Sequence, residues 1–469
     1  MINNKIHLSG IWKWLLCGKS PQIILFHCLL AALVILISKW FYAFWIGILV
    51  FSYFNNKFKV QFFLTPFILA NILSAEVFSR ALKLNPIIPY EFGKYFLFVL
   101  FIYLITRTNI KGSLARYGLL ILFLLLPSLF ISLLSESDAI LKELIFNGFG
   151  IVNLALGIIF FSQYKISLHN FKTLLRLIII STLPFVIWSS FKTPDLSSID
   201  FSLTSSASGI GGFSSNQIST LFGFVFSVCV FQIINKYYFF KNSLLSLSLA
   251  MLFLFKALIS FSRGGVIVAF VALFLVFFVS RKKIKKSYFK NFLLLIPLLF
   301  TLFYFTNKLT DNSLLLRFQG ETNSTLSGRS EKSLNSISTG RFDIMINDLN
   351  IWNDNLFFGT GIGQSPKLRV NYGEEFIISH LEFSRLLAEN GIFGLFIIIT
   401  LIIIIIRIIN FRKNILNKSF AVFCFTISIL TSFHASMRTS ITPILFSFAL
   451  MQIINERINT KIQKGYDNE

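Results

Sequence analysis

The sequence predicts an all-α fold, a polytopic bundle of helices that cross a membrane. Of its 469 residues, 55% are apolar and only 13% are charged. A soluble protein of this length would need many more charged residues to cover its surface. Apolar runs of roughly 16–20 residues recur along the whole chain, which is about the length that spans the hydrocarbon core of a bilayer. The placement of basic residues between these runs gives the bundle an orientation.

Each apolar run is expected to form one membrane-spanning helix. The runs cover residues 21–39, 40–54, 60–78, 91–106, 116–134, 144–162, 173–191, 217–235, 244–260, 265–280, 289–306, 391–410, 419–433 and 440–455. The expected count is therefore fourteen. Because very tight turns separate the first run from the second and the ninth from the tenth, twelve or thirteen spans are the alternatives.

The basic residues predict which ends of the helices face the cytoplasm. If the N-terminus is inside and the runs alternate, the inner segments hold most of the 43 Lys and Arg residues, including the block 281–286. The acidic residues on that side are only Glu456, Asp467 and Glu469. Since cytoplasmic loops of membrane proteins are enriched in Lys and Arg, both termini are predicted to be cytoplasmic. The net charge of +23 is then a topology signal that predicts contact with anionic membrane lipid and no nucleic-acid partner.

Loop lengths divide the chain into a membrane bundle over 1–306, a large outer segment over 307–390 and a second membrane part over 391–469. A shorter polar outer loop covers 192–216. Loops as long as the large outer segment are usually functional or disordered. Its first part, 307–339, is rich in Ser, Asn, Thr and Gly, so we expect it to be irregular or mobile.

The second part of the outer segment is patterned. Phe342, Met345, Leu349 and Trp352 recur at helical spacing with polar residues between them. This predicts an amphipathic helix that lies on the bundle or on the lipid surface. A glycine-rich turn at 358–363 follows, and then a helix that carries His380 and continues into the twelfth apolar run.

No cofactor is predicted. The four cysteines are Cys17, Cys28, Cys229 and Cys424, and none lies in an outer loop, so a disulfide framework is not expected. No cluster of His, Cys and Asp has the spacing of metal ligands, and no nucleotide-binding glycine motif is present. A reaction at this membrane would therefore draw its energy from an activated substrate.

The segment 379–394 is the strongest candidate for chemistry, because ionisable residues are concentrated there just before an apolar run. His380 titrates near neutral pH, so it is a candidate general base or hydrogen-bond donor; the alternative is a polar residue at the membrane boundary. Glu382 is predicted to orient the imidazole or to act as the base itself. The alternative for Glu382 is a ladder of exposed ion pairs with Arg385 and Glu389, each worth a few tenths of a kcal/mol.

Two outer arginines are candidate phosphate ligands. Arg263 lies between two apolar runs, where an arginine is costly without a partner such as a phosphate, and Gly264 and Gly265 would let a ligand or another backbone approach. The alternative for Arg263 is a structural role in a tight helical hairpin. Arg341 opens the amphipathic helix, where a cation opposes the helix dipole unless an anion is shared there. Weaker outer candidates are Arg80, Lys94, Arg438, Asn216 and Gln217, the last two as sugar ligands or as the cap of the eighth span.

In three segments of its C-terminal half the chain resembles the O-antigen polymerase/ligase family. The turn 262–265 resembles the Ser-Arg motif of the family, and 340–363 resembles the stretch that opens its long outer loop. His380 followed by Gly391 and Gly394 has the spacing of the ligase motif. Leu381 departs from that motif, because a polar residue usually follows the histidine.

The resemblance implies a membrane glycosyltransferase of the C-type fold in the bacterial inner membrane. Its donor would be an oligosaccharide linked to undecaprenyl diphosphate, and its mechanism would be inverting and metal-independent. Arg263 and Arg341 would hold the diphosphate, and His380 or Glu382 would take the proton from an acceptor hydroxyl. The acceptor is a growing glycan in a polymerase or lipid A-core in a ligase, and a chain-length regulator is a further implied partner. Because Leu381 breaks the ligase pattern, polymerase is favoured.

Two other functional classes compete with this interpretation. A flippase for lipid-linked oligosaccharide would also have about fourteen spans, and a non-catalytic accessory subunit would need no reactive residues. Many transporters are built from internal repeats with broken helices, and no repeat is evident here. The asymmetry of one very long outer segment also favours an enzyme over a transporter.

Overall fold

The computed structural model of the chain is almost entirely helical. It describes residues 8, 10–110, 112–134, 140–194, 201, 203, 207–237, 243–281, 286–329, 331–373 and 381–454. The bundle helices are α1 (Gly10–Cys17), α2 (Ser20–Leu36), α3 (Trp40–Phe54), α4 (Phe58–Ala81), α5 (Phe92–Arg107), α6 (Ala115–Leu124), α7 (Leu126–Leu133), α8 (Ile140–Phe161), α9 (Leu168–Lys192), α10 (Ser215–Ile234), α11 (Ser243–Ile259), α12 (Arg263–Ser280), α13 (Lys286–Leu309), α19 (Glu382–Phe411), α20 (Ile415–Thr431) and α21 (Ile441–Leu450). Every predicted apolar run overlaps one of these helices, or the pair α6 and α7.

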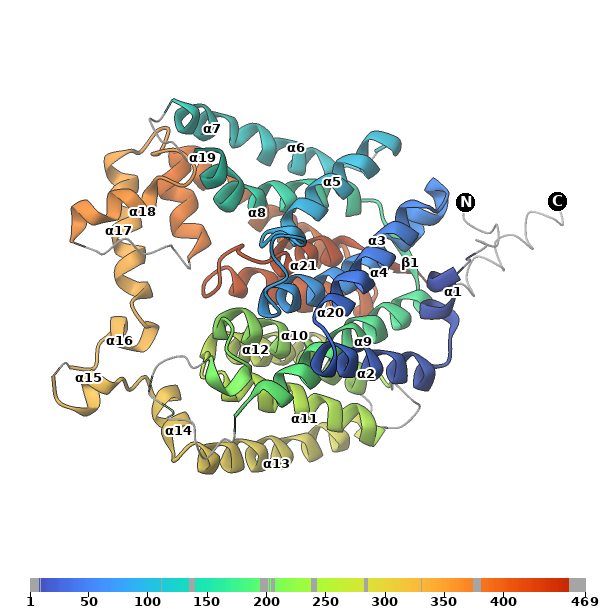
Figure 1. The fold of residues 1–469 in the computed structure, drawn as a ribbon. Coiled ribbons are helices and arrows are strands. Elements are labelled where there is room, and N and C mark those ends of the chain that lie inside the picture. The colour runs from blue at the N-terminus through green and yellow to red at the C-terminus, as the bar shows by residue number, and fades with distance from the viewer. Residues whose placement is uncertain are drawn as a thin grey trace.

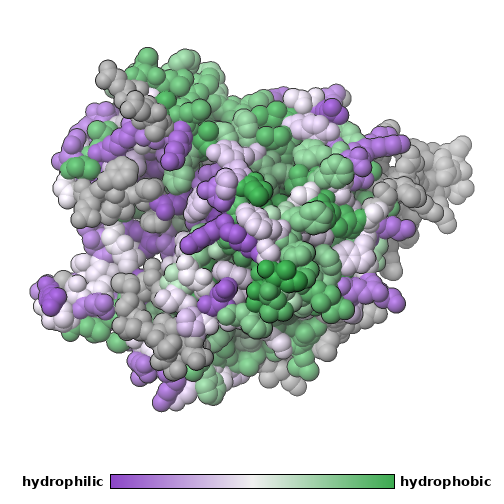
Figure 2. All heavy atoms as spheres, in the orientation of Figure 1, coloured by the Kyte–Doolittle hydropathy of each residue, from purple (hydrophilic) through white to green (hydrophobic). Residues whose placement is uncertain are grey.

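The length and apolar composition of the helices indicate a multi-pass membrane protein. Within the described residues, seven helices are long and apolar enough to cross a membrane, or eight if the bent pair of α1 and α2 forms one span. Several others, including α3, α20 and α21, are apolar but shorter. Figure 2 shows broad apolar surface over the bundle helices and hydrophilic residues gathered over the outer segment. The predicted count of fourteen spans stays a prediction.

Two short strands correct the prediction at the end of the last apolar run. The run was expected to be helical over 440–455, but α21 ends at Leu450 and Gln452–Ile454 forms strand β2. β2 pairs in parallel with β1 (Lys165–Ser167). The side chain of Asn417 donates to the carbonyl of Ile453 (2.8 Å) and accepts from its N–H (2.6 Å). These tertiary hydrogen bonds favour the extended backbone over the local helical preference of the run.

The expectation that 307–339 is irregular is wrong. This segment contains the short helices α14 (Ser313–Phe318), α15 (Asn323–Leu326) and α16 (Leu334–Ser338). Capping boxes at Thr322–Thr325 and Ser333–Ser336 begin the second and third of these helices. The Ser and Thr residues that suggested disorder therefore satisfy the free backbone N–H groups at helix starts. A helix is present at the predicted position as α17 (Arg341–Asp354), followed by the short helices α18 (Ser365–Leu368) and η4 (Arg369–Tyr372). The predicted apolar stripe of α17 is only half-buried, and the residues that it buries are Ile344, Asp348 and Ile351.

The contacts between loops lie at two ends of the bundle. At one end β1 and β2 pair, and Arg176 of α9 donates to the carbonyl of Leu15. At the other end Arg80 contacts the carbonyl of Arg438, and α17 packs against α19. Figure 1 shows α1 and β1 at the end of the bundle opposite α15, α17 and α18. In the described part of the chain, the outer segment and the loop between α20 and α21 thus lie at the same end, where Arg341 also approaches the carbonyl of His434.

The orientation of these two ends is testable with topology reporters. A reporter fused after Gly328, in the outer segment, is expected to report a periplasmic position because of the basic bias of the opposite end. A matched fusion after Asn414, in the loop between α19 and α20, is expected to report a cytoplasmic position. A cytoplasmic signal after Gly328 would contradict the orientation and every functional assignment that depends on it.

Candidate functional site

The glycine-rich turn after α17 docks on the first part of α19. The N–H of Gly361 donates to the carbonyl of Glu389 (3.0 Å), and the N–H of Ile392 donates to that of Phe357 (3.2 Å). Gly391, which lies between Glu389 and Ile392 on α19, adopts φ 57° and ψ −136°. A Cβ at this position would lie 2.5 Å from the carbonyl oxygen of Phe357. Only glycine allows this backbone and this approach. The kink at Gly391 separates a polar outer turn of α19 from its apolar membrane part.

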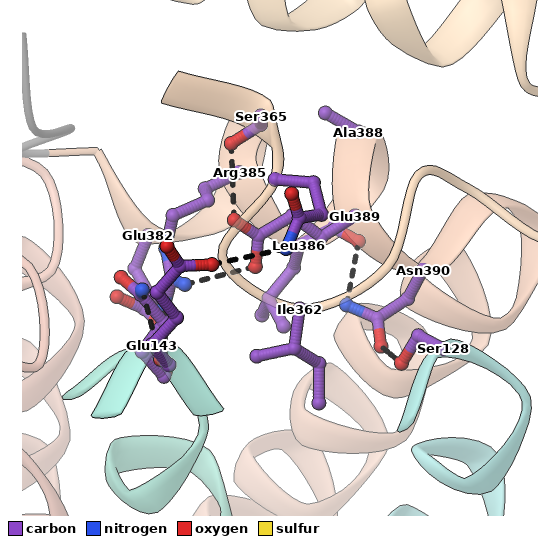
Figure 3. Close-up of polar contacts among 12 residues, drawn as sticks. Ser128, Glu143, Ile362, Ser365, Glu382, Arg385, Leu386, Ala388, Glu389 and Asn390 are labelled. Atoms are coloured by element: carbon purple, nitrogen blue, oxygen red, sulfur yellow. Dashed lines mark hydrogen bonds and ion pairs between the residues drawn. The ribbon is translucent and has the colours of Figure 1, made fainter. Parts of the chain in front are cut away.

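The outer part of α19 carries a buried ion-pair ladder, seen in Figure 3. Arg385 bonds Glu382 at 2.5 Å and Glu389 at 2.9 Å. The expected i,i+3 and i,i+4 pairs are therefore present, but the expectation that they are exposed is wrong: the three side chains are 0–5% exposed. The turn that docks on the kink and α8 cover this face of the helix. Because the ladder is buried, removing one member would cost several kcal/mol, far more than at a surface.

A second buried pair fixes α17 to this region. Arg369 of η4 donates two hydrogen bonds to Asp348 of α17, at 2.6 and 2.8 Å. The hydroxyl of Ser384 on α19 donates to the other oxygen of the same carboxylate at 2.6 Å. Burial raises the pKa of Asp348 above its ordinary value, and the Arg369 guanidinium opposes this effect. These bonds hold the amphipathic helix against the helix that follows the predicted catalytic histidine.

Glu382 holds the connection between α20 and α21. Its Oε2 accepts hydrogen bonds from the N–H of Met437 (3.1 Å) and from the hydroxyl of Ser436, while its Oε1 accepts from Arg385. The N–H of Glu382 in turn donates to the carbonyl of Ser432 (2.9 Å). Both carboxylate oxygens thus have protein donors, which is the arrangement of a positioning residue.

Arg80 belongs to a second buried network on the other side of the same connection. It bonds Glu76 at 2.6 Å and lies 3.5 Å from Glu91, which also pairs with Lys94 at 2.9 Å. Glu76 accepts in addition from the backbone N–H of Ser440 (2.7 Å). Glu76 and Glu91 were not among the predicted site residues, although their i,i+4 and i,i+3 spacing to Arg80 and Lys94 was a signal for them.

The side chain of Gln217 and the carbonyls of Tyr90 and Arg438 accept the remaining hydrogen bonds of Arg80. Arg80, a predicted phosphate ligand, therefore already has protein groups as its hydrogen-bond acceptors. Arg438 itself lies half-buried between the two networks and lines a small pocket. The other lining residues include Phe146, Asn147, Glu382, Arg385 and Ser436.

Arg263 and Arg341 lie on different elements, and both donate to main-chain carbonyls of the outer segment. The guanidinium of Arg263 donates to the carbonyls of Arg317 (2.9 Å) and Ile337 (2.5 Å). Arg341 donates to the carbonyl of Ser338 at 2.9 Å and is 3.5 Å from that of His434. Among the ion pairs of the described residues, none joins either arginine to a carboxylate. Their positive charge is therefore balanced by no protein anion in the described part of the chain.

Gly264 and Gly265 were expected to let either a ligand or another backbone approach, and in the structure protein groups lie against both. A Cβ on Gly264 would lie 2.4 Å from the His434 ring, and one on Gly265 would lie 2.3 Å from the Ser219 backbone. The glycines thus allow α12 to approach α10 and the connection after α20. Asn216 supports the same turn, because its Oδ1 accepts from the hydroxyl of Ser262 at 2.8 Å.

His380 lies outside the described residues, and the structure neither places it against the arginines nor separates it from them. The expectation that the helix carries His380 is wrong, because α19 begins at Glu382 and Leu381 before it is extended (φ −108°, ψ 111°). Leu381 is 7% exposed. In the described part of the chain, no group of three or more His, Cys, Asp and Glu residues could hold a metal ion.

The chain was compared with known protein families, and one family matches the region that contains this site. Residues 247–399 match the family described as O-antigen ligase. The match covers about a third of the chain and includes Arg263, Arg341, His380 and Glu382. No curated protein matches the chain. The match supports assignment to the O-antigen polymerase/ligase family.

Proposed function

We propose that the chain is a surface-polysaccharide polymerase, because residues 247–399 match the family described as O-antigen ligase. In this proposal it transfers a glycan from undecaprenyl diphosphate to a sugar hydroxyl at the periplasmic face of the inner membrane. The reaction is inverting and needs no metal. The C–O bond between the donor sugar and the diphosphate breaks, the acceptor oxygen forms the new glycosidic bond, and the acceptor proton passes to a base.

One observation carries the proposal: Arg263 and Arg341 meet at the predicted outer end and pair with no carboxylate of the described residues. Guanidinium groups match phosphate oxygens in geometry and stay charged at neutral pH. Placed at a membrane surface, they suit the diphosphate of a lipid-linked donor. As the sugar leaves, negative charge grows on that diphosphate, and fixed cations would stabilise it.

For the base we favour His380 over Glu382. A general base needs a free lone pair toward the proton that it accepts. Glu382 accepts from Arg385, Ser436 and Met437, so in this proposal it positions the segment between α20 and α21. His380 precedes α19 by two residues in the sequence, and the histidine side chain is the one that ordinarily exchanges a proton near neutral pH. Arg438, which lines the pocket beside Glu382, is proposed to contact the substrate there, and Arg80 supports that segment through the carbonyl of Arg438.

Ligase activity is the second candidate, because the matched family is described as O-antigen ligase. Leu381 favours the polymerase, since it is a buried apolar residue at the position where the ligase motif has a polar one. A flippase is the third candidate. The three differ in their products, so one assay separates them.

The assay incubates purified protein with lipid-linked repeat units, with and without lipid A-core. We expect a ladder of longer lipid-linked glycans without added lipid A-core, because the growing chain is itself the acceptor. Product only with lipid A-core would replace the polymerase by the ligase. Movement of lipid-linked glycan across vesicles without any new glycosidic bond would exclude both transferases.

A further inference from the structure

A third arginine, Arg317, lies beside the two predicted phosphate ligands. It belongs to α14, and its main-chain carbonyl accepts the 2.9 Å hydrogen bond from Arg263. Its Nε points to the carbonyl of Phe261 at 3.5 Å, and its side chain is buried, with the residue 5% exposed. Like Arg263 and Arg341, it forms no ion pair with a carboxylate among the described residues.

Hydrogen bonds to neighbouring carbonyls bring the three arginines together: Arg263 donates to the carbonyls of Arg317 and Ile337, and Arg341 donates to that of Ser338. Burial, and then the charges of Arg263 and Arg341, lower the pKa of Arg317 to about 10. Burial and the charge of Arg263 also lower the pKa of Arg341. Other buried arginines of the chain are neutralised: Arg369 by Asp348, and Arg385 by two glutamates. Arg317 is buried, and Arg263 and Arg341 are half-buried. Cations in such positions without a protein anion are costly unless a ligand supplies the opposite charge.

An apolar cavity of about 260 Å³ begins next to these arginines. Its lining includes Phe318, which follows Arg317 directly, and Val266, which is one helical turn after Arg263. Leu258 of α11, Phe270 of α12 and Phe303 of α13 complete most of the wall. Ile267 and Phe270 are 49% and 37% exposed on the outer surface of the bundle, so the cavity faces the predicted lipid. A cationic group at one end of an apolar cavity suits a ligand with an anionic head and a hydrocarbon chain.

We propose that Arg317 is a ligand-binding residue that completes a three-arginine site for the diphosphate head of an isoprenoid lipid, whose chain enters the cavity between α11, α12 and α13. This inference rests on the proposed function for the identity of the lipid, while the binding of a diphosphate by Arg317 is independent of any transfer reaction. Three guanidinium groups can donate hydrogen bonds to both phosphate groups of a diphosphate, whereas a single phosphate offers fewer acceptor oxygens. The site should therefore prefer a diphosphate to a single phosphate.

The test measures binding and thermal stability of the full-length protein in detergent. Probes are inorganic phosphate, inorganic diphosphate and farnesyl diphosphate. We expect diphosphate to bind more tightly than phosphate and to raise the melting temperature, because it binds only the folded site. Farnesyl diphosphate should bind more tightly still, because its chain buries apolar surface in the cavity. Equal binding of the two diphosphates would overturn the lipid part of the proposal.

Two variants separate binding from a structural role of Arg317. Arg317→Gln should weaken diphosphate binding roughly 10- to 100-fold, the effect of losing hydrogen bonds to a charged group. The same change should raise the melting temperature without ligand, because it relieves repulsion from Arg263 and Arg341. Arg317→Lys should recover only part of the affinity, because a point charge lacks the planar fork. Arg329→Gln, a change of an exposed arginine in the same segment, is the matched control and should alter neither quantity.

A structural role predicts the opposite pattern. Arg317→Gln would then lower the melting temperature without ligand and leave diphosphate affinity unchanged, and that result would overturn the proposal. Failure of glycan transfer in the polymerase assay, with diphosphate binding intact and sensitive to Arg317, would reject the proposed function but keep the anion site. The two failures are thus distinguishable.

Discussion

Arg263→Ala and Arg341→Ala are each expected to reduce glycan transfer by roughly 100- to 1000-fold or more, the usual effect of removing one group that stabilises developing negative charge. Both side chains use main-chain carbonyls as acceptors and pair with no carboxylate of the described residues. Their removal therefore leaves no buried protein anion without its partner in that region. Transfer from a lipid-linked donor should fall while the amount of protein in the membrane stays unchanged.

The conservative variants sharpen this result. Arg263→Lys and Arg341→Lys keep the charge but lose the bidentate fork, so they should recover activity only in part. Arg329→Ala, at an exposed position of the outer segment, is the control and should transfer glycan normally. Full activity in both alanine variants would remove the phosphate ligands from the mechanism.

His380→Ala is expected to lower turnover by roughly two to four orders of magnitude, the usual contribution of a general base. The rate of the parent protein should rise as the pH increases through roughly 6.5, because only the neutral imidazole accepts a proton. This dependence should be missing from the residual activity of the alanine variant. The measurement is a pH–rate profile of transfer at saturating donor.

Glu382→Gln is the matched comparison on the same segment. Successive residues of a helix are 100° apart, so two residues two positions apart would point roughly 200° apart if the helix included both. The amide keeps the shape of the carboxylate but weakens the bonds to Arg385 and Met437. We therefore expect a loss of stability, of roughly 3 kcal/mol for an altered buried pair, and a smaller loss of turnover per folded molecule than in His380→Ala.

The opposite outcome would reverse the assignment. Normal turnover in His380→Ala together with an inactive but stable Glu382→Gln protein would make Glu382 the base. His380 would then be a polar residue at the membrane boundary. Melting temperatures of both variants are needed, because an unstable Glu382→Gln protein could lose activity without any catalytic role of the glutamate.

Parts of the site were predictable from local spacing. The i,i+3 and i,i+4 positions of Glu382, Arg385 and Glu389 predicted their ion pairs, because side chains at these separations share one helix face. The apolar spacing of Phe342, Met345, Leu349 and Trp352 predicted α17 in the same way. The burial of the ladder was not predictable, because the turn that covers it and α8 are distant in sequence.

Arg317 is a residue whose role could not be predicted from local sequence spacing. Nothing near it in sequence distinguishes it from Arg329, which is exposed in the same polar segment. Only the packing of α14 against the turn before α12 brings it to Arg263. Glu76 and Glu91 differ from Arg317, because their i,i+4 and i,i+3 spacing to Arg80 and Lys94 was a local signal.

The sequence by itself determined that this is a multi-pass membrane protein, and it predicts which ends of the helices face the cytoplasm. Apolar length and the placement of basic residues are properties of consecutive segments, and the membrane acts on each segment separately. The tertiary structure decided which outer loops meet, that the ion pairs of Arg385 and Arg80 are buried, and that Arg263, Arg317 and Arg341 gather without a carboxylate partner among the described residues. Charge balance and burial depend on neighbours that are far apart in the chain, so only the packed bundle specifies them.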